Sequence, residues 1–214
     1  MIKGIIFDMD GTLVDSMEYW INSGMELVAE MILPKYPKFL SKDIAFIDVP
    51  KHLLTDIDDK KLLGEMYYRW NYEKMKKNYE FVQLKEGVKE FLDSCKSKGI
   101  KMSVATATTK DLTFDVLKRL GIDSYFEEIV TVDMGYKPKI FSDIYDHCLE
   151  TLGFSKDEVL VFEDTFEPIN TLKNSFYKVV GVNDKSSSFY QKKIKELVNY
   201  YIDTYKDLNI ENLK

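Results

Sequence analysis

Residues 2–12 read IKGIIFDMDGT, a short apolar run that ends in two acidic residues and a glycine. Residues 2–7 are almost continuously apolar, as expected for a central strand of a parallel sheet whose two faces are both covered. Asp8 and Asp10 follow at the carboxyl end of this run, and Gly11 permits a sharp turn there. The stretch therefore predicts a buried strand that brings two carboxylates to one edge of a sheet.

Four further apolar stretches are each followed by a polar loop: residues 101–105, 128–132, 159–162 and 178–182. Segments with apolar side chains at helical spacing separate them: residues 87–98, 110–120, 141–152 and 189–198. Strands that alternate with helices over short connections predict an α/β fold, a doubly wound parallel sheet in three layers of the Rossmann type. Such sheets bind ligands beyond the carboxyl ends of their strands.

This alternation stops between residues 14 and 80. Amphipathic helical patterns take its place at residues 16–32, 41–54 and 59–77. The chain has 214 residues, enough for one α/β core and a modest insertion. We therefore expect a core of residues 1–13 and 81–214 and a small all-helical domain of residues 14–80.

Composition excludes several classes of partner. The net charge of −6 and the presence of only two arginines argue against binding to nucleic acid or to anionic membrane surfaces. No apolar stretch reaches 18 residues, and the N-terminal segment has no secretory pattern. Cys95 and Cys148 lack CxxC spacing, which favours free thiols in a reducing compartment. We expect a cytoplasmic protein, a monomer or weak dimer, that acts on a small molecule.

The pair Asp8 and Asp10 suits phosphoryl transfer. One residue apart in an extended chain, the two side chains lie on the same face. One carboxylate can attack phosphorus to form an acyl phosphate, while the other protonates the leaving oxygen and later deprotonates a water. Asp-Gly pairs are also frequent turn formers, but a turn alone does not explain two acids after a wholly apolar strand.

An anionic nucleophile that attacks an anionic phosphate needs positive charge in the site. Glu163 and Asp164, directly after an apolar strand, are suitable oxygen ligands for Mg²⁺, although such a pair also suits a helix N-terminus. Lys137, in a loop after a strand, is the candidate ammonium group. Thr106 and Ala107, at the end of another strand, offer a hydroxyl and backbone amides to a phosphate.

These residues match the motifs of a known family. The sequence resembles the haloacid dehalogenase superfamily, specifically its members with a small helical cap inserted after the first motif, which include phosphoglycolate-phosphatase-like enzymes and β-phosphoglucomutase. FDMDGTLVDS, at residues 7–16, is a strong match to the nucleophile motif. VATATT, YKP and VLVFED, at residues 104–109, 136–138 and 159–164, match the next three motifs in order.

The resemblance implies a role for each matching residue. Asp8 would be the nucleophile, and Asp10 the general acid and base that also offers its backbone carbonyl to the metal. Thr106 would hold the transferring phosphate, and Lys137 would bridge it to the nucleophile. The phosphate-binding residues would be Gly11, Thr12, Thr106, Ala107 and Lys137. The Mg²⁺ ligands would be Asp8, Asp10, Asp164 and Glu163, the last either directly or through a water.

The lysine motif departs from the family pattern, which usually reads Gly-Lys-Pro-x-Pro-Asp. Tyr136 replaces the glycine, the second proline is missing, and Lys139 is a rival for the role of Lys137. Trp20 stands where mutase members commonly carry a histidine after Glu-Tyr, which weakens the mutase interpretation.

The expected function is therefore a Mg²⁺-dependent phosphatase that hydrolyses a small phosphorylated metabolite through an aspartyl phosphate on Asp8. The alternatives are a β-phosphoglucomutase-like phosphomutase and a non-catalytic protein that binds a phosphate ligand.

Overall fold

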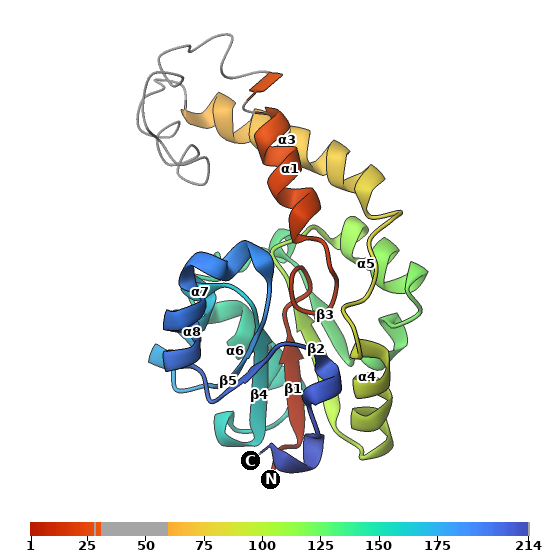
Figure 1. Ribbon diagram of the computed structural model, residues 1–214, viewed down its shortest axis with the longest axis vertical. Coiled ribbons are helices and arrows are strands. Elements are labelled where there is room, and N and C mark those ends of the chain that lie inside the picture. The colour runs from red at the N-terminus through yellow and green to blue at the C-terminus, as the bar shows by residue number, and fades with distance from the viewer. Residues whose placement is uncertain (28, 31–59, 214) are drawn as a thin grey trace. The chain divides into compact units, whose positions relative to one another are not determined.

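The structure is a computed structural model that describes residues 1–27, 29–30 and 60–213. It divides the chain into two compact units. The first consists of Met1–Met17 and Val82–Lys214, and the second of Glu18–Phe81. Each unit is described below by itself (Figure 1).

The first unit is built on a parallel sheet. Within the described residues this sheet has six strands in the order β3-β2-β1-β4-β5-β6, and each neighbouring pair is parallel. The strands are β1 (Gly4–Phe7), β2 (Lys101–Ala105), β3 (Glu128–Val130), β4 (Val159–Glu163), β5 (Lys178–Val182) and β6 (Tyr200–Ile202). The predicted α/β class with a doubly wound parallel sheet is confirmed. β1 lies in the interior of the sheet, between β2 and β4, and all four of its residues are buried there.

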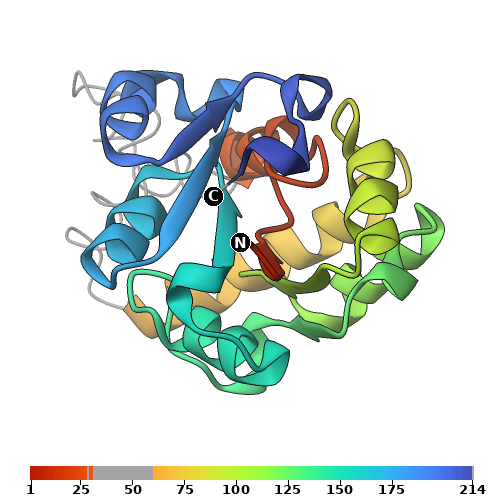
Figure 2. The ribbon, with the colours of Figure 1, turned by 90° about the horizontal axis from the view of Figure 1, so that it is seen from below.

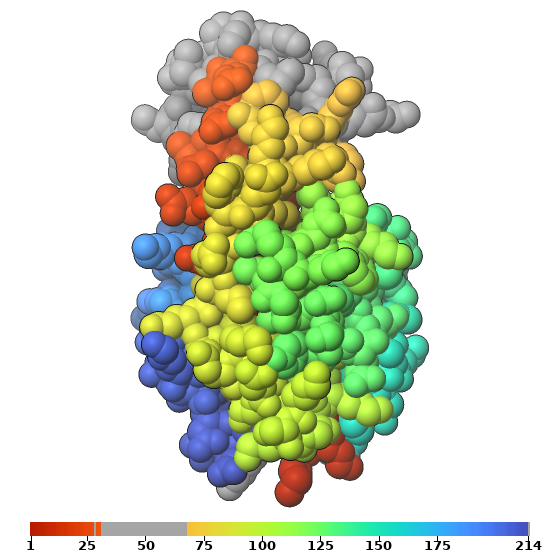
Figure 3. All heavy atoms as spheres, turned by 90° about the vertical axis from the view of Figure 1, so that its right-hand side faces the viewer, coloured from red at the N-terminus to blue at the C-terminus, as the bar shows by residue number. Residues whose placement is uncertain are grey.

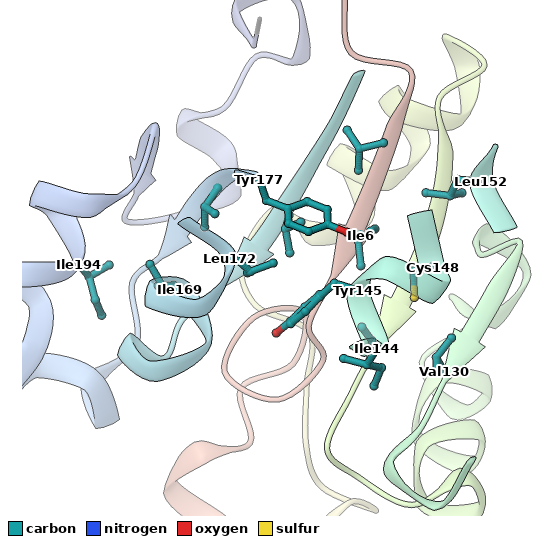
Figure 4. Close-up of a cluster of buried hydrophobic side chains, with 14 residues drawn as sticks. Ile6, Val130, Ile144, Tyr145, Cys148, Leu152, Ile169, Leu172, Tyr177 and Ile194 are labelled. Carbon is teal, nitrogen blue, oxygen red and sulfur yellow. The ribbon is translucent and has the colours of Figure 1, made fainter. Parts of the chain in front are cut away.

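Helices cover both faces of the sheet. They are α4 (Val88–Ser97), α5 (Lys110–Arg119), α6 (Asp143–Leu152), α7 (Phe166–Asn174) and α8 (Gln191–Leu197). The view along the sheet shows α4 and α5 on one side and α6, α7 and α8 on the other (Figure 2). Figure 3 shows the outer face formed by α4, in yellow-green, and α5, in green. A cluster of buried apolar side chains fills the layer between the sheet and α6, α7 and α8 (Figure 4).

The structure differs from the sequence prediction in one strand and in one helix end. β6, three residues at the edge of the sheet, is not among the predicted strands, whereas the equally short edge strand β3 is, because it lies within the longer predicted run of residues 128–132. Helix α6 begins at Asp143 and not at residue 141, because Phe141 belongs to a turn in which its N–H donates to the carbonyl of Pro138. The turn that precedes α6 also determines that Lys139 is the lysine that reaches the candidate site, as described below.

The second unit contains α1 (Met17–Leu27) and α3 (Lys60–Asn78), where helices are predicted at residues 16–32 and 59–77. The predicted helix at residues 41–54 lies outside the described residues. Ser23 of α1 donates to Asn71 Oδ1 of α3 at 2.7 Å, and Trp70 Nε1 donates to the Ser23 carbonyl at 3.0 Å. These bonds join the two helices. In the described part of the chain, no helix combines the length and the apolar character needed to cross a membrane.

Candidate active site

The candidate site lies at the carboxyl ends of β1, β2 and β4. Asp8 directly follows β1, Thr106 directly follows β2, and Glu163 is the last residue of β4. The N–H of Asp8 donates to the Phe162 carbonyl at 2.9 Å, which extends the β1–β4 ladder to the site. Because parallel strands end at the same edge, residues more than 150 positions apart meet there.

Three of the predicted acids come together. Carboxylate oxygens of Asp8, Glu163 and Asp164 lie within 4.8 Å of one another, and all three residues are buried. The pKa of Asp8 is raised to about 7, mainly by burial; the Lys139 ammonium opposes this shift and the Glu163 carboxylate adds to it. Burial, Glu163 and Asp8 together hold the pKa of Asp164 well above its usual range. This cluster therefore requires compensating positive charge.

Lys139 supplies that charge. Its Nζ lies 2.5 Å from Asp8 Oδ1 and 2.9 Å from Glu163 Oε1. Burial disfavours the ammonium form, but the carboxylates of Asp8 and Glu163 outweigh it and keep the pKa of Lys139 well above its usual value. Lys139 is therefore a buried cation between two buried carboxylates.

The structure does not bring Lys137, the predicted lysine, into this cluster, and places its rival Lys139 there. The Lys137 side chain is 62% exposed and pairs with Asp143 Oδ1 at 2.9 Å. The turn at Pro138 and Phe141 points Lys139 into the cluster, and Lys139 stands four residues before Asp143. The lysine and aspartate of the family pattern Gly-Lys-Pro-x-Pro-Asp have this same spacing. Aligning from the aspartate selects Lys139 and aligning from the Lys-Pro pair selects Lys137, so the sequence leaves both alignments open.

Glu163 is held by hydrogen bonds on both oxygens. Oε1 accepts from Lys139 and from the hydroxyl of Tyr145 at 3.1 Å. Oε2 accepts the backbone N–H groups of Asp164 at 2.8 Å and Thr165 at 3.2 Å. A carboxylate has about four acceptor positions, so these four donors fix its orientation. Sequence reasoning missed Tyr145, because an aromatic residue inside a helix is normally assigned to packing.

Asp10 is not one of the three clustered acids, although its charge contributes to the raised pKa of Asp8, and its carboxylate has its own partners. Its Oδ1 accepts from the hydroxyl of Ser16 at 2.5 Å, and its Oδ2 accepts from the hydroxyl of Thr108 at 2.7 Å. Sequence reasoning did not single out these two hydroxyls. Thr108 lies in the loop after β2 and Ser16 in the segment that follows the first motif, so the only signal was their place within matched motifs.

Gly11 and Thr12 support Asp164. Gly11 has φ of +78°, and a Cβ built on it would lie 2.4 Å from Asp164 Oδ2. Glycine is therefore required both by the backbone conformation and by the space available. The Thr12 hydroxyl is completely buried and donates to Asp164 Oδ1 at 3.2 Å. Both residues were predicted to bind phosphate. In the structure they contact the Asp164 carboxylate: Gly11 leaves room for it, and Thr12 donates a hydrogen bond to it.

Thr106 and Ala107 lie in the loop after β2. The Thr106 N–H continues the sheet by donating to the Val130 carbonyl at 2.9 Å, so this amide is already used. Its hydroxyl oxygen accepts the N–H of Thr108 at 3.1 Å, which leaves the hydroxyl proton to donate elsewhere. Ala107 is exposed. Phosphate contact by these residues stays a prediction.

The chemistry of the donor set fits Mg²⁺. Oxygen ligands are the ones that this hard cation prefers, and the three clustered acids offer them at short range. Asp164 Oδ2 is buried and has no hydrogen-bond partner among the described residues. A buried carboxylate oxygen without a partner is costly, and a bound cation would compensate it.

Comparison with known proteins identifies the family. Residues 5–182 match the family model described as haloacid dehalogenase-like hydrolase. The chain belongs to the haloacid dehalogenase-like hydrolases. Its match includes β1, β2 and β4, the strands that carry the site. The resemblance found from the sequence motifs is confirmed.

Individual members of the haloacid dehalogenase-like hydrolases are similar over most of the chain. A phosphorylated carbohydrates phosphatase of Thermotoga maritima is 30% identical over 187 residues, covering 85% of each chain. A pyrophosphatase PpaX of Bacillus velezensis is 28% identical, covering 85% of this chain and 83% of that protein. The crystal structure of β-phosphoglucomutase from Clostridium difficile has a TM-score of 0.74 at 22% identity, covering 99% of this chain and 95% of that one, which shows a shared fold.

Proposed function

We propose that this protein is a Mg²⁺-dependent phosphatase that hydrolyses a small phosphorylated metabolite through an aspartyl phosphate on Asp8. The observation that carries the proposal is the buried cluster in which Lys139 contacts Asp8 and Glu163, with Asp10 close by in sequence. The names of the two relatives, a phosphorylated carbohydrates phosphatase and a pyrophosphatase, support the reaction class.

In the first step a carboxylate oxygen of Asp8 attacks phosphorus, and the bond from phosphorus to the leaving oxygen breaks. Asp10, in its protonated form, gives its proton to that oxygen. In the second step Asp10 takes a proton from a water whose oxygen attacks phosphorus, and the bond to Asp8 breaks to release inorganic phosphate. The hydroxyls of Ser16 and Thr108 hold the Asp10 carboxylate in a defined position.

Positive charge has to accompany both steps. Mg²⁺, held by Asp8 and Asp164 with Asp10 offering its carbonyl, would reduce the repulsion between carboxylate and phosphate. Glu163 already accepts from four donors, so it would stand beside the ion as a neighbouring negative charge and not as a direct ligand. Lys139 contributes a fixed ammonium beside the attacking carboxylate. Glu163 holds this ammonium from the other side, so the lysine is oriented before the substrate arrives.

Phosphate release from a panel of substrates tests the proposal. The panel contains sugar phosphates, other small phosphate monoesters and inorganic pyrophosphate, each with and without Mg²⁺. We expect release from at least one of them with Mg²⁺ and loss on addition of a chelator. Asp8→Asn should remove activity completely, because its amide is a very poor nucleophile.

Asp15→Asn is the matched control, since Asp15 is an exposed acid of the same segment. It should retain wild-type activity. Absence of phosphate release from the whole panel, or equal activity in the Asp8→Asn variant, would contradict the proposal. Ligand binding without turnover would favour the non-catalytic alternative, and interconversion of sugar phosphates faster than their hydrolysis would favour the mutase.

A further inference from the structure

Tyr145 is a completely buried side chain of α6 that reaches the candidate site. Its ring packs among the apolar side chains between the sheet and the helices, near Ile144 and Leu172 (Figure 4). In this view its hydroxyl lies at the opposite end from the helix backbone. The ring thus belongs to the core while the hydroxyl belongs to a polar cluster.

The contacts of Tyr145 involve two residues of that cluster. Its hydroxyl donates to Glu163 Oε1 at 3.1 Å. The Nζ of Lys139 lies 5.3 Å from the centroid of its ring, within the range of a cation–π interaction. Tyr145 therefore contacts both ends of the Lys139–Glu163 ion pair, and within the described residues it forms no hydrogen bond to Asp8.

The hydroxyl occupies the last acceptor position of the Glu163 carboxylate. The other three are taken by Lys139 and by two backbone N–H groups. Without the Tyr145 hydroxyl, Oε1 of Glu163 would accept a hydrogen bond from Lys139 alone. The carboxylate would then be less restrained and could rotate together with the lysine. Because Lys139 also bonds Asp8, such a rotation would move the ammonium relative to the attacking oxygen.

We propose that Tyr145 is a positioning residue, which orients Glu163 and, through it, the Lys139 ammonium beside Asp8. This inference rests on the proposed phosphatase function. It assigns to Tyr145 a role in the alignment of charge during the reaction and no contact with the substrate. Its removal should therefore affect the transition state more than substrate binding.

Tyr145→Phe tests the role because it keeps the buried ring and removes only the hydroxyl. Tyr177→Phe is a matched control. Tyr177 is 2% exposed, packs in the same cluster, and donates its hydroxyl to Asp146 Oδ1 at 2.7 Å, so it loses an equivalent hydrogen bond elsewhere. Both variants should have a similarly reduced melting temperature. The folded fraction of each variant is measured by circular dichroism, and kcat is calculated per folded molecule.

We expect Tyr145→Phe to lower kcat about tenfold, as is typical when a partner of a site residue is removed. KM should change by less than about twofold, since no substrate contact is lost. Tyr177→Phe should keep the wild-type kcat and KM. Binding of orthovanadate, which mimics five-coordinate phosphorus, should weaken in Tyr145→Phe in parallel with kcat, while binding of inorganic phosphate should change little.

Phosphate release by the wild-type protein tests the proposed function separately. With that activity established, equal kcat in the two variants would overturn the role of Tyr145 alone. A raised KM at unchanged kcat would overturn it as well, because it would indicate a contribution to substrate binding.

Discussion

Lys139 Nζ lies 2.5 Å from Asp8 Oδ1, although 131 positions separate the two residues in the chain. The same ammonium bonds Glu163, so one buried cation is shared by carboxylates from two neighbouring strands, β1 and β4. Loss of one partner of such a group leaves uncompensated buried charge. Two measurable consequences follow from this arrangement and from the residues around it, and a third from an ion pair at the opposite end of the same strands.

Lys139→Met should abolish phosphatase activity and destabilise the fold. Two buried carboxylates would lose their cation, which typically costs about 3 kcal/mol or more of unfolding free energy. Lys137→Met is the control. This residue is 62% exposed and forms a surface pair, so its loss should change stability by less than about 1 kcal/mol and leave activity unchanged. Urea unfolding and kcat/KM measure both effects, and the reverse ranking would contradict the assignment of Lys139.

Gly11→Ala should inactivate the protein. It should also lower the free energy of unfolding by more than the cost of placing alanine at a positive φ, because the added Cβ would clash with Asp164. Gly135→Ala separates the two contributions. Both glycines have positive φ, +78° and +88°, but a Cβ at Gly135 meets nothing within 4 Å, whereas one at Gly11 would clash with Asp164. Gly135→Ala should cost about 1 kcal/mol and keep activity. Equal effects of the two substitutions on activity and on thermal unfolding would disprove the clash.

Glu158 should make stability depend on pH in the acid range. It bonds Lys3 Nζ at 2.6 Å and accepts the N–H and hydroxyl of Ser155. The bond to Lys3, followed by those to Ser155, lowers the pKa of Glu158 from 4.5 to about 2. The unfolded chain therefore binds this proton at higher pH than the folded one. The stabilisation is complete above the unfolded value and is lost as pH falls toward the folded value.

Unfolding of the wild type and of Glu158→Gln measures this effect. The wild type should be the more stable at about pH 6, and the difference should shrink steadily toward about pH 3.5. A Lys3→Met background should remove most of the dependence, because it removes the largest cause of the pKa shift. If the difference in unfolding free energy between the wild type and Glu158→Gln did not vary with pH, the lowered pKa of Glu158 would not be its cause. Phosphatase activity should not change, since Lys3 and Glu158 directly precede β1 and β4, at the end of the strands opposite the site.

The sequence by itself determined the α/β class, the family and the position of the acids. Buried parallel strands are apolar along their whole length, so β1, β2, β4 and β5 are visible as runs, and the acids directly after β1 and β4 had to meet at one edge. Of the two three-residue edge strands, β3 lies within the longer run of residues 128–132, whereas the polar residues Asn199 and Asp203 flank β6 and leave no such pattern. The strands can be recognised from the sequence because a buried strand needs apolar side chains at its own positions, whatever the rest of the fold is.

Only the tertiary structure decided which side chains complete the site. A lysine motif with two lysines is ambiguous in sequence, and the turn before α6 decides that Lys139 enters the cluster while Lys137 remains exposed. Tyr145 likewise reads as a core residue, and only the fold shows its hydroxyl against Glu163. The physical reason is that the direction of a side chain at a turn, and its partners across the sheet, depend on long-range packing that neighbouring residues do not encode.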